Sequence, residues 1–135
     1  MGASLVYLES PNEEISFEEG SNDYIKFVAA QMQGWRINME DAHIADLQFH
    51  PERQQSLFCV FDGHGGKEVA LYSSAHYSDI LRESVGYKNQ KYEEALKESF
   101  LSVDVHIELP DGKEELTKMK KSAPPNKSPI FKILG

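Results

Sequence analysis

The sequence has 135 residues, of which 40% are hydrophobic and 27% charged, a balance typical of one folded domain with one core. Its formal net charge of −8 is unevenly distributed along the sequence: residues 111–135 carry +3 and the first 110 residues carry −11. An acidic body disfavours nucleic acid as the main partner and suits cationic ligands, divalent metals included.

Cysteine content and hydropathy restrict the compartment. A single cysteine, Cys59, excludes an intrachain disulfide framework and a cysteine-based zinc site. The sequence contains no apolar run of membrane-spanning length and no secretory pattern at its N-terminus. We therefore expect an intracellular protein, in the cytoplasm or the nucleus, without a transmembrane segment.

Strand patterns dominate the first half of the chain. Residues 5–8 predict a short strand, residues 10–23 an acidic connector with breakers, and residues 24–32 a second strand. Residues 33–36 indicate a loop. From residue 42 to residue 49 apolar and polar side chains alternate with period 2, which predicts a half-buried strand.

The next segment, residues 57–61, is continuously apolar and predicts a strand covered on both faces. It ends abruptly at Asp62, Gly63 and His64, followed by two more glycines. A strand end is a rigid place from which to present a carboxylate, and Gly63 lets the backbone approach a ligand closely. The alternative interpretation, an ordinary turn with a solvated histidine, stays open for this motif alone.

Helical periodicity begins after Gly66. Residues 67–83 predict an amphipathic helix, and a second helix is expected between a cap at Asn89 and a stop at Pro110. The expected buried positions are Val69, Tyr72, Ala75 or His76 and Ile80 in the first helix, and Tyr92, Leu96, Phe100 and Val103 in the second. The remaining residues, with prolines and dispersed lysines, indicate a linker, with Asp111 in a turn.

Strands followed by helices predict an α+β fold in which helices cover a mainly antiparallel sheet. We expect two regions: residues 1–108 as the folded part, and residues 109–135 as a tail, either a linker or the start of an insertion.

A second polar cluster lies between two predicted strands. It contains Arg36, whose planar guanidinium suits phosphate or carboxylate, and the adjacent carboxylates Glu40 and Asp41. Alone, this cluster is typical of a solvated loop with an exposed ion pair. Together with Asp62 and His64 it contains the parts of a metal-assisted phosphoester hydrolysis site, of either a phosphatase or a nuclease.

Two stretches resemble the signatures of the metal-dependent serine/threonine protein phosphatases of the 2C type (the PPM family). These are MQGWRINMEDAH at residues 32–43 and FCVFDGHGG at residues 58–66. The stretches GGKEVALY at 65–72 and ALKESFLSVD at 95–104 resemble the gamma isoform. The similarity covers roughly residues 1–108, so the chain corresponds to the N-terminal part of that domain.

The resemblance implies a fold, a cofactor and roles for site residues. The implied fold is a four-layer αββα sandwich, with two Mg²⁺ or Mn²⁺ ions between the sheets. Asp62 would bridge both ions, Gly63 would offer its carbonyl, Glu40 would serve one ion and Asp41 would act through water. Arg36 would hold the substrate phosphate and His64 would protonate the leaving oxygen, whereas His43 would be structural.

The implied activity is dephosphorylation of phosphoserine and phosphothreonine in protein substrates by a metal-activated water, in a complete domain that is monomeric. The further aspartate motifs of the family are not found after Asp104. The alternative is therefore a truncated, catalytically inactive homologue that binds phosphoproteins or another partner.

Overall fold

The computed structural model describes residues 7–122 of the chain. Two β-hairpins come first and four α-helices follow. The elements are β1 (Tyr7–Ser21), β2 (Lys26–Arg36), β3 (Ala42–His50), the short 3₁₀ helix η1 (Pro51–Arg53), β4 (Gln55–Phe61), α1 (Glu68–Glu83), α2 (Val85–Lys88), α3 (Tyr92–Glu108) and α4 (Pro110–Ser122). Leu5 and Val6 of the expected first strand, and residues 123–135 of the expected tail, lie outside the described residues.

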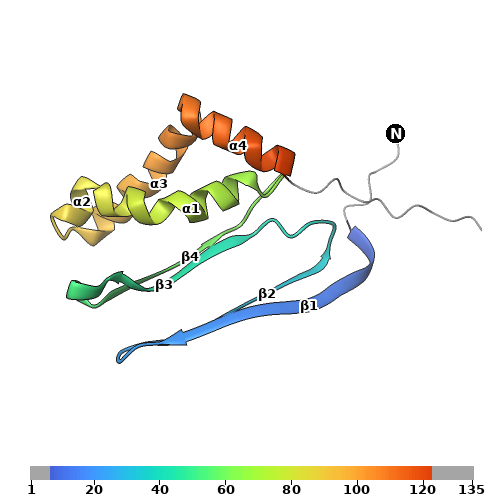
Figure 1. Ribbon diagram of the computed structural model, residues 1–135, viewed down its shortest axis with the longest axis horizontal. Coiled ribbons are helices and arrows are strands. Elements are labelled where there is room, and N and C mark those ends of the chain that lie inside the picture. Colours follow the sequence, from blue (N-terminus) through green and yellow to red (C-terminus); the bar gives the residue numbers. More distant parts are fainter. Residues whose placement is uncertain (1–6, 123–135) are drawn as a thin grey trace, which may run out of the picture.

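The elements form layers. β1 pairs with β2 and β3 pairs with β4, both antiparallel. The helices cover one face of the β3–β4 hairpin, and the β1–β2 hairpin lies on the other face (Figure 1). The predicted α+β architecture is confirmed, and it is consistent with the N-terminal part of a four-layer αββα sandwich.

The hydrophobic core lies between the β3–β4 hairpin and the helices. Aromatic rings fill it: Phe49 meets Tyr87 with ring centroids 5.4 Å apart, and Phe61 meets Tyr77 at 5.7 Å. Burying rings of this size in a preferred tilted arrangement supplies much of the stabilisation of such a core. The buried members are Phe49, Leu57, Tyr77, Leu81, Tyr87, Ala95 and Val103.

The period-2 pattern of residues 42–49 is confirmed by the register of β3 against β4. Ile44 pairs with Cys59 and faces the core, whereas Ala45 pairs with Phe58, whose ring lies 5.3 Å from Phe27 of the other hairpin. Phe49 departs from the alternation and joins the core, because the register shifts between Asp46 and His50.

The prediction of a connector over residues 10–23 is wrong. β1 continues to Ser21, because residues 15–21 pair with β2 without interruption. The breakers at Pro11 and Asn12 coincide with register shifts, where an irregular strand can leave a backbone group unpaired. Local composition could not reveal this, since the pairing partner is a later segment of the chain.

The loop predicted at residues 33–36 is also wrong, because β2 extends to Arg36. The local irregularity that suggested a loop is nevertheless present at Gly34, which has a φ of 64°. A residue with a side chain is strained in this left-handed region, so glycine allows the strand to continue past the distortion.

The first predicted helix is confirmed, but part of its expected buried face is wrong. Tyr72 is buried as expected, whereas Val69 is 52% exposed. The remaining buried positions of α1 are Ala70, Ser73, Tyr77 and Leu81. The hydroxyl of Ser73 donates to the Val69 carbonyl at 2.8 Å, which allows a polar side chain in the buried face.

The second predicted helix is α3, which ends before Pro110 as expected. Val103 is buried, but Leu96 and Phe100 are 44% and 54% exposed. The other buried positions are the small residues Ala95 and Ser99, which let α1 and α3 approach closely. Asn89 flanks the C-terminus of α2, and Lys91 is the residue before α3.

The linker predicted after Pro110 is wrong over residues 110–122, which form α4. Pro110 starts this helix, a position at which its missing N–H costs nothing. Asp111, expected in a turn, lies in the first turn of α4. Glu115 anchors the helix to α1, because its carboxylate oxygens lie 2.9 and 3.0 Å from His76 Nε2. Within residues 7–122 no helix has both the length and the apolar character that crossing a membrane requires.

Candidate metal and phosphate site

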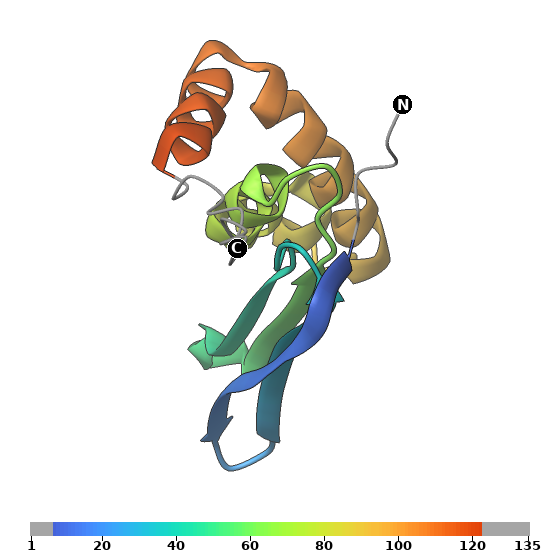
Figure 2. The same ribbon diagram turned by 90° about the vertical axis from the view of Figure 1, so that its right-hand side faces the viewer.

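The two signature segments meet at one end of the β3–β4 hairpin. β3 begins at Ala42 and β4 ends at Phe61, and these two residues are paired across the ladder. The segment before β3 and the segment after β4 therefore leave the sheet side by side. Figure 2 shows both connections at the end of the hairpin that lies near the helices.

Gly63 brings the two segments into direct contact. Its backbone is buried against Glu40, and a Cβ at position 63 would overlap the Glu40 carbonyl oxygen. Only glycine permits this approach without moving the backbone. Because of this contact, the carboxylates of Asp62 and Glu40 lie on adjoining segments.

Asp62 and His64 lie on either side of this contact. His64 Nδ1 lies 3.4 Å from Asp62 Oδ1 and 3.3 Å from the Asp62 carbonyl oxygen. Both side chains are open to solvent, with 73% of Asp62 and 74% of His64 exposed. A proton on Nδ1 can be shared with Asp62, which leaves Nε2 directed away from that carboxylate.

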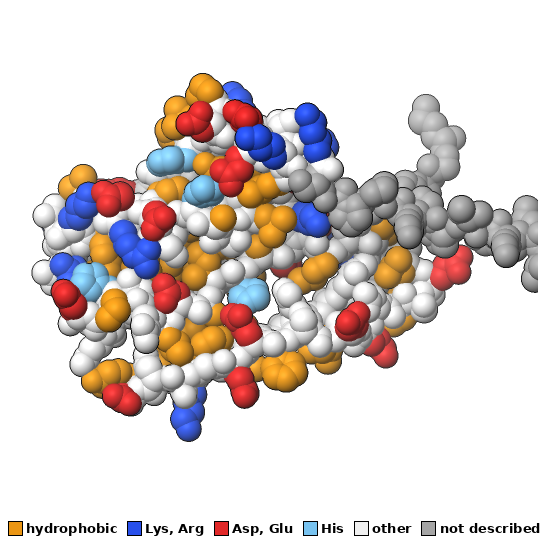
Figure 3. All heavy atoms as spheres, viewed as in Figure 1, with side chains coloured by type: hydrophobic (Ala, Val, Ile, Leu, Met, Phe, Trp, Pro, Cys, Tyr) orange, Lys and Arg blue, Asp and Glu red, His pale blue; other side chains and the backbone are white. Residues whose placement is uncertain are grey.

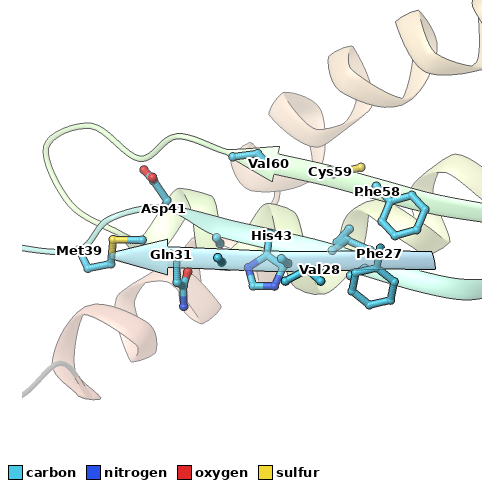
Figure 4. A pocket seen from close by; sticks show the side chains of 14 residues that line it. Phe27, Val28, Gln31, Met39, Asp41, His43, Phe58, Cys59 and Val60 are labelled. Atoms are coloured by element: carbon cyan, nitrogen blue, oxygen red, sulfur yellow. The ribbon is translucent and has the colours of Figure 1, made fainter. Parts of the chain in front are cut away.

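Glu40 and Asp41 differ in accessibility. Glu40 is half-buried and Asp41 is exposed. Asp41 also lines a pocket of about 420 Å³ between the two hairpins, with Met39 beside it. Figure 4 shows Asp41 at one end of this pocket and the facing rings of Phe27 and Phe58 at the other. Of the candidate ligands, Asp41 is therefore the one that borders the space between the hairpins.

The donor set fits a hard divalent cation. Three carboxylates and a backbone carbonyl lie at one end of the hairpin, and oxygen ligands are those that Mg²⁺ and Mn²⁺ prefer. Among residues 7–122, no hydrogen bond or ion pair engages the carboxylates of Glu40 and Asp41, so both are available to a ligand. Acidic side chains along the β1–β2 hairpin add to the negative field (Figure 3).

The described residues supply a part of such a centre. No group of three or more metal-ligating side chains converges among residues 7–122. The contact of Gly63 with the Glu40 carbonyl joins the two segments, and Asp41 lines the pocket between the hairpins. A complete site requires further ligands beside these.

Arg36 stands at the end of β2, where it pairs with Tyr7 of β1. Its side chain is exposed, and among the described residues its guanidinium has no ion pair or hydrogen bond. A guanidinium without an internal partner is free to bind an anion through two parallel N–H groups. Arg36 precedes Glu40 by four positions, so the guanidinium and the carboxylates of Glu40 and Asp41 are carried by the end of β2 and the segment that joins it to β3.

His43 lies apart from these groups. Its Nε2 is 3.2 Å from Glu18 Oε1, so the side chain links β3 to β1 across the space between the hairpins. This location supports the expectation that His43 is structural.

One polar residue of the first signature was assigned no role by sequence. Gln33 donates through its side-chain amide to the backbone around Arg36. The only sequence signal is that Gln33 lies directly before Gly34 and three residues before Arg36. Composition and periodicity assign no role to such a position.

Comparison with known proteins agrees with the geometry. Residues 25–123 match the family described as Protein phosphatase 2C, and the chain belongs to this family. It is 42% identical over 114 residues to "Probable protein phosphatase 2C 5" of Paramecium tetraurelia, across 84% of the chain. It is 40% identical over 117 residues to "Protein phosphatase 2C homolog 2" of Hypocrea jecorina (strain QM6a), across 80% of the chain.

A nematode relative extends the similarity. "Protein phosphatase ppm-1.G" of Caenorhabditis elegans is 35% identical over 128 residues, across 95% of the chain. The match to the gamma isoform in particular stays a prediction. The chain spans 38% of the length of the Paramecium relative, 26% of the Hypocrea relative and 25% of the nematode relative.

Proposed function

We propose that this chain supplies the N-terminal portion of a metal-dependent protein phosphatase centre, which removes phosphate from phosphoserine and phosphothreonine in proteins. The observation that carries the proposal is the contact of Gly63 with the Glu40 carbonyl. It joins the two signature segments, which otherwise would be two unrelated polar loops.

The carboxylates would hold the cations. Asp62, the Gly63 carbonyl and Glu40 are the ligands that this chain offers to two Mg²⁺ or Mn²⁺ ions, and Asp41 would act through water. When bound, such ions activate water and neutralise charge on a phosphoester. The net charge of −11 in the first 110 residues favours their accumulation.

Arg36 would bind the substrate phosphate. Its exposed guanidinium presents a planar fork that matches two phosphate oxygens, and the described residues do not compete for it. Binding through such a fork fixes the orientation of the phosphate as well as its position.

His64 would act on the leaving group. When the phosphorus–oxygen bond breaks, the departing serine or threonine oxygen takes a proton from the imidazole. The imidazole lies beside a candidate metal ligand, with Nδ1 3.4 Å from the Asp62 carboxylate. The exposed position of His64 allows the ring to reach a bound phosphoprotein.

A second candidate function, a catalytically inactive module that binds phosphoproteins or a partner, is favoured by one observation. The described residues bring together fewer than three metal-ligating side chains. Such a module would retain phosphate binding at Arg36 without turnover.

Metal binding can be tested directly on the 135-residue chain. Mn²⁺ broadens the NMR signals of nuclei close to it, so substoichiometric Mn²⁺ should first remove the backbone amide signals of Glu40, Asp62 and Gly63. Asp62→Asn should abolish this selectivity, whereas Asp79→Asn, at a side chain that is 81% exposed on α1, should not. Broadening spread evenly over the glutamates of β1 would contradict the assignment.

Activity separates the two candidate functions. The polypeptide is incubated with a phosphothreonine peptide and Mn²⁺, and released phosphate is measured. Turnover that Asp62→Asn abolishes and Asp79→Asn preserves would support the phosphatase. Selective Mn²⁺ and phosphopeptide binding without turnover would favour the binding module.

A further inference from the structure

The Gln33 side chain forms hydrogen bonds with the backbone on both sides of the peptide bond that follows Arg36. Its side-chain Nε2 donates to the Arg36 carbonyl at 2.8 Å and to the Ile37 carbonyl at 2.9 Å. Both N–H groups of the amide are thereby used, at distances typical of well-formed hydrogen bonds.

Two consecutive carbonyls do not normally converge on one donor. In an extended strand, successive peptide groups point in opposite directions, so the carbonyls of residues 36 and 37 would diverge. Their convergence on Gln33 shows that the chain bends at this point, and residues 37 and 38 are indeed in a bend. Gly34, with its φ of 64°, provides the change of direction within β2 that lets Gln33 face residues ahead of it.

The other end of the Gln33 amide is also held. Its Oε1 accepts from Asn12 Nδ2 at 3.3 Å, and both side chains are half-buried. Asn12 sits between the two register shifts of β1, and its own Oδ1 accepts from the Glu14 N–H at 3.0 Å. The irregular part of β1 therefore fixes Asn12, Asn12 orients Gln33, and Gln33 fixes the bend after Arg36.

Arg36 depends on this arrangement, because its guanidinium has no partner of its own among residues 7–122. An exposed arginine without such contacts is directed only by the backbone that carries it. Loss of the two hydrogen bonds would let residues 36–38 return toward extended geometry and would spread the guanidinium over many positions.

We propose that Gln33 is a positioning residue for the phosphate-binding arginine, acting through the carbonyls of Arg36 and Ile37. The proposal rests on the proposed function, in which Arg36 binds the phosphate group. Gln33 itself touches no substrate, so its contribution should appear in the affinity for phosphate and should disappear when Arg36 is absent.

The test measures binding of inorganic phosphate to the 135-residue chain in the presence of Mg²⁺, by titration of ¹⁵N-labelled protein. Gln33→Met keeps the length of the side chain and removes both donors. We expect it to raise the Kd for phosphate about tenfold, because the lost positioning should cost about as much free energy as one hydrogen bond. Gln31→Met is the matched control, since Gln31 lies in the same strand and its side chain makes no hydrogen bond with the described residues. It should leave the Kd unchanged.

A double-mutant cycle separates positioning from general damage. In an Arg36→Ala background, Gln33→Met should add nothing to the rise in Kd. The same tenfold loss in that background would overturn the proposal, because Gln33 would then act on something other than Arg36.

Two further outcomes distinguish the two levels of inference. If Arg36→Ala weakens phosphate binding and Gln33→Met does not, the positioning role is overturned and the proposed function stands. If the unsubstituted chain binds no phosphate, or Arg36→Ala changes nothing, both are overturned. Asn12→Ala serves if Gln33→Met fails to fold. It frees Gln33 Oε1 and the Glu14 N–H but keeps both Gln33 donors, and it should raise the Kd by about two- to threefold.

Discussion

The ring of Tyr77 on α1 packs edge-on against the ring of Phe61 at the end of β4, with centroids 5.7 Å apart and planes at 67°. Tyr77 is completely buried, and Phe61 directly precedes Asp62. The helix layer thus supports the last residue of the strand that presents the candidate metal ligand. Stability and metal affinity should therefore be coupled at this contact.

Tyr77→Ala should cost about 3–5 kcal/mol of unfolding free energy, because it leaves a large cavity beneath β4. It should also weaken Mn²⁺ binding, since Phe61 loses its support. Urea denaturation and a Mn²⁺ titration measure the two effects. Tyr24→Ala, at a tyrosine that is 66% exposed, is the control and should cost well under half as much. Equal costs for the two variants would show that Tyr77 does not anchor this contact.

Tyr77 should also make the protein sensitive to alkaline pH. Burial raises the pKa of the Tyr77 hydroxyl above its ordinary value, while the hydrogen bond from Ser99 Oγ at 2.9 Å acts in the opposite direction. The folded protein therefore keeps this proton at a pH where the unfolded chain releases it. The resulting stability is fully present below about pH 10 and is lost as the pH rises through the folded-state pKa.

Tyr77→Phe should make the alkaline loss of stability shallower, and should lower stability at neutral pH by about 0.5–1.5 kcal/mol through the lost hydrogen bond. Urea unfolding at a series of pH values on both sides of pH 10 measures this dependence. Some alkaline dependence should persist, because burial also raises the pKa values of Tyr72 and Tyr87. An unchanged slope in the variant would assign the effect to those two residues.

Gly63→Ala should destabilise the protein by about 1–3 kcal/mol, because the new methyl group would overlap the Glu40 carbonyl and the backbone would have to move. Selective Mn²⁺ broadening at Glu40 and Asp62 should be lost together with stability. Gly65→Ala is the comparison: Gly65 has a φ of 73° but no neighbour that a Cβ would meet, so only backbone strain is expected. If Gly63→Ala kept both stability and Mn²⁺ selectivity, the contact would not organise the site.

His43→Asn should leave Mn²⁺ selectivity unchanged and cost at most about 1 kcal/mol, because its pair with Glu18 is partly exposed and lies between the hairpins. A double-mutant cycle with Glu18→Gln should show a coupling of about 0.5 kcal/mol that shrinks at high salt. A large change in Mn²⁺ binding would instead move His43 into the metal site.

Features that depend on neighbouring residues were predictable from the sequence. The continuous apolar run before Asp62 defines β4, the alternation after residue 42 defines β3, and the change to helical spacing defines α1. The residues of the candidate site could be proposed for the same reason, because each signature is a short contiguous segment, and their roles stay predictions. A strand end that carries Asp62 presents it wherever the strand lies.

Features that depend on distant residues were not predictable in this way. The acidic residues of β1 become a strand because β2 supplies the hydrogen-bonding partners, and α4 is held by a contact between Glu115 and His76, 39 positions apart. Ser99, and not the expected Phe100, lies on the buried face of α3. A short distance between packed helices favours small side chains there, whatever their polarity.

The sequence by itself determined the family signatures, the succession of strands followed by helices, and the chemical types available for a metal and phosphate site. Only the tertiary structure decided that Gly63 touches Glu40 and that the Gln33 amide turns toward the carbonyls beside Arg36. The physical reason is that periodicity and propensity act over a few residues, whereas close backbone approach and side-chain hydrogen bonding to a bent backbone exist only once the chain has folded.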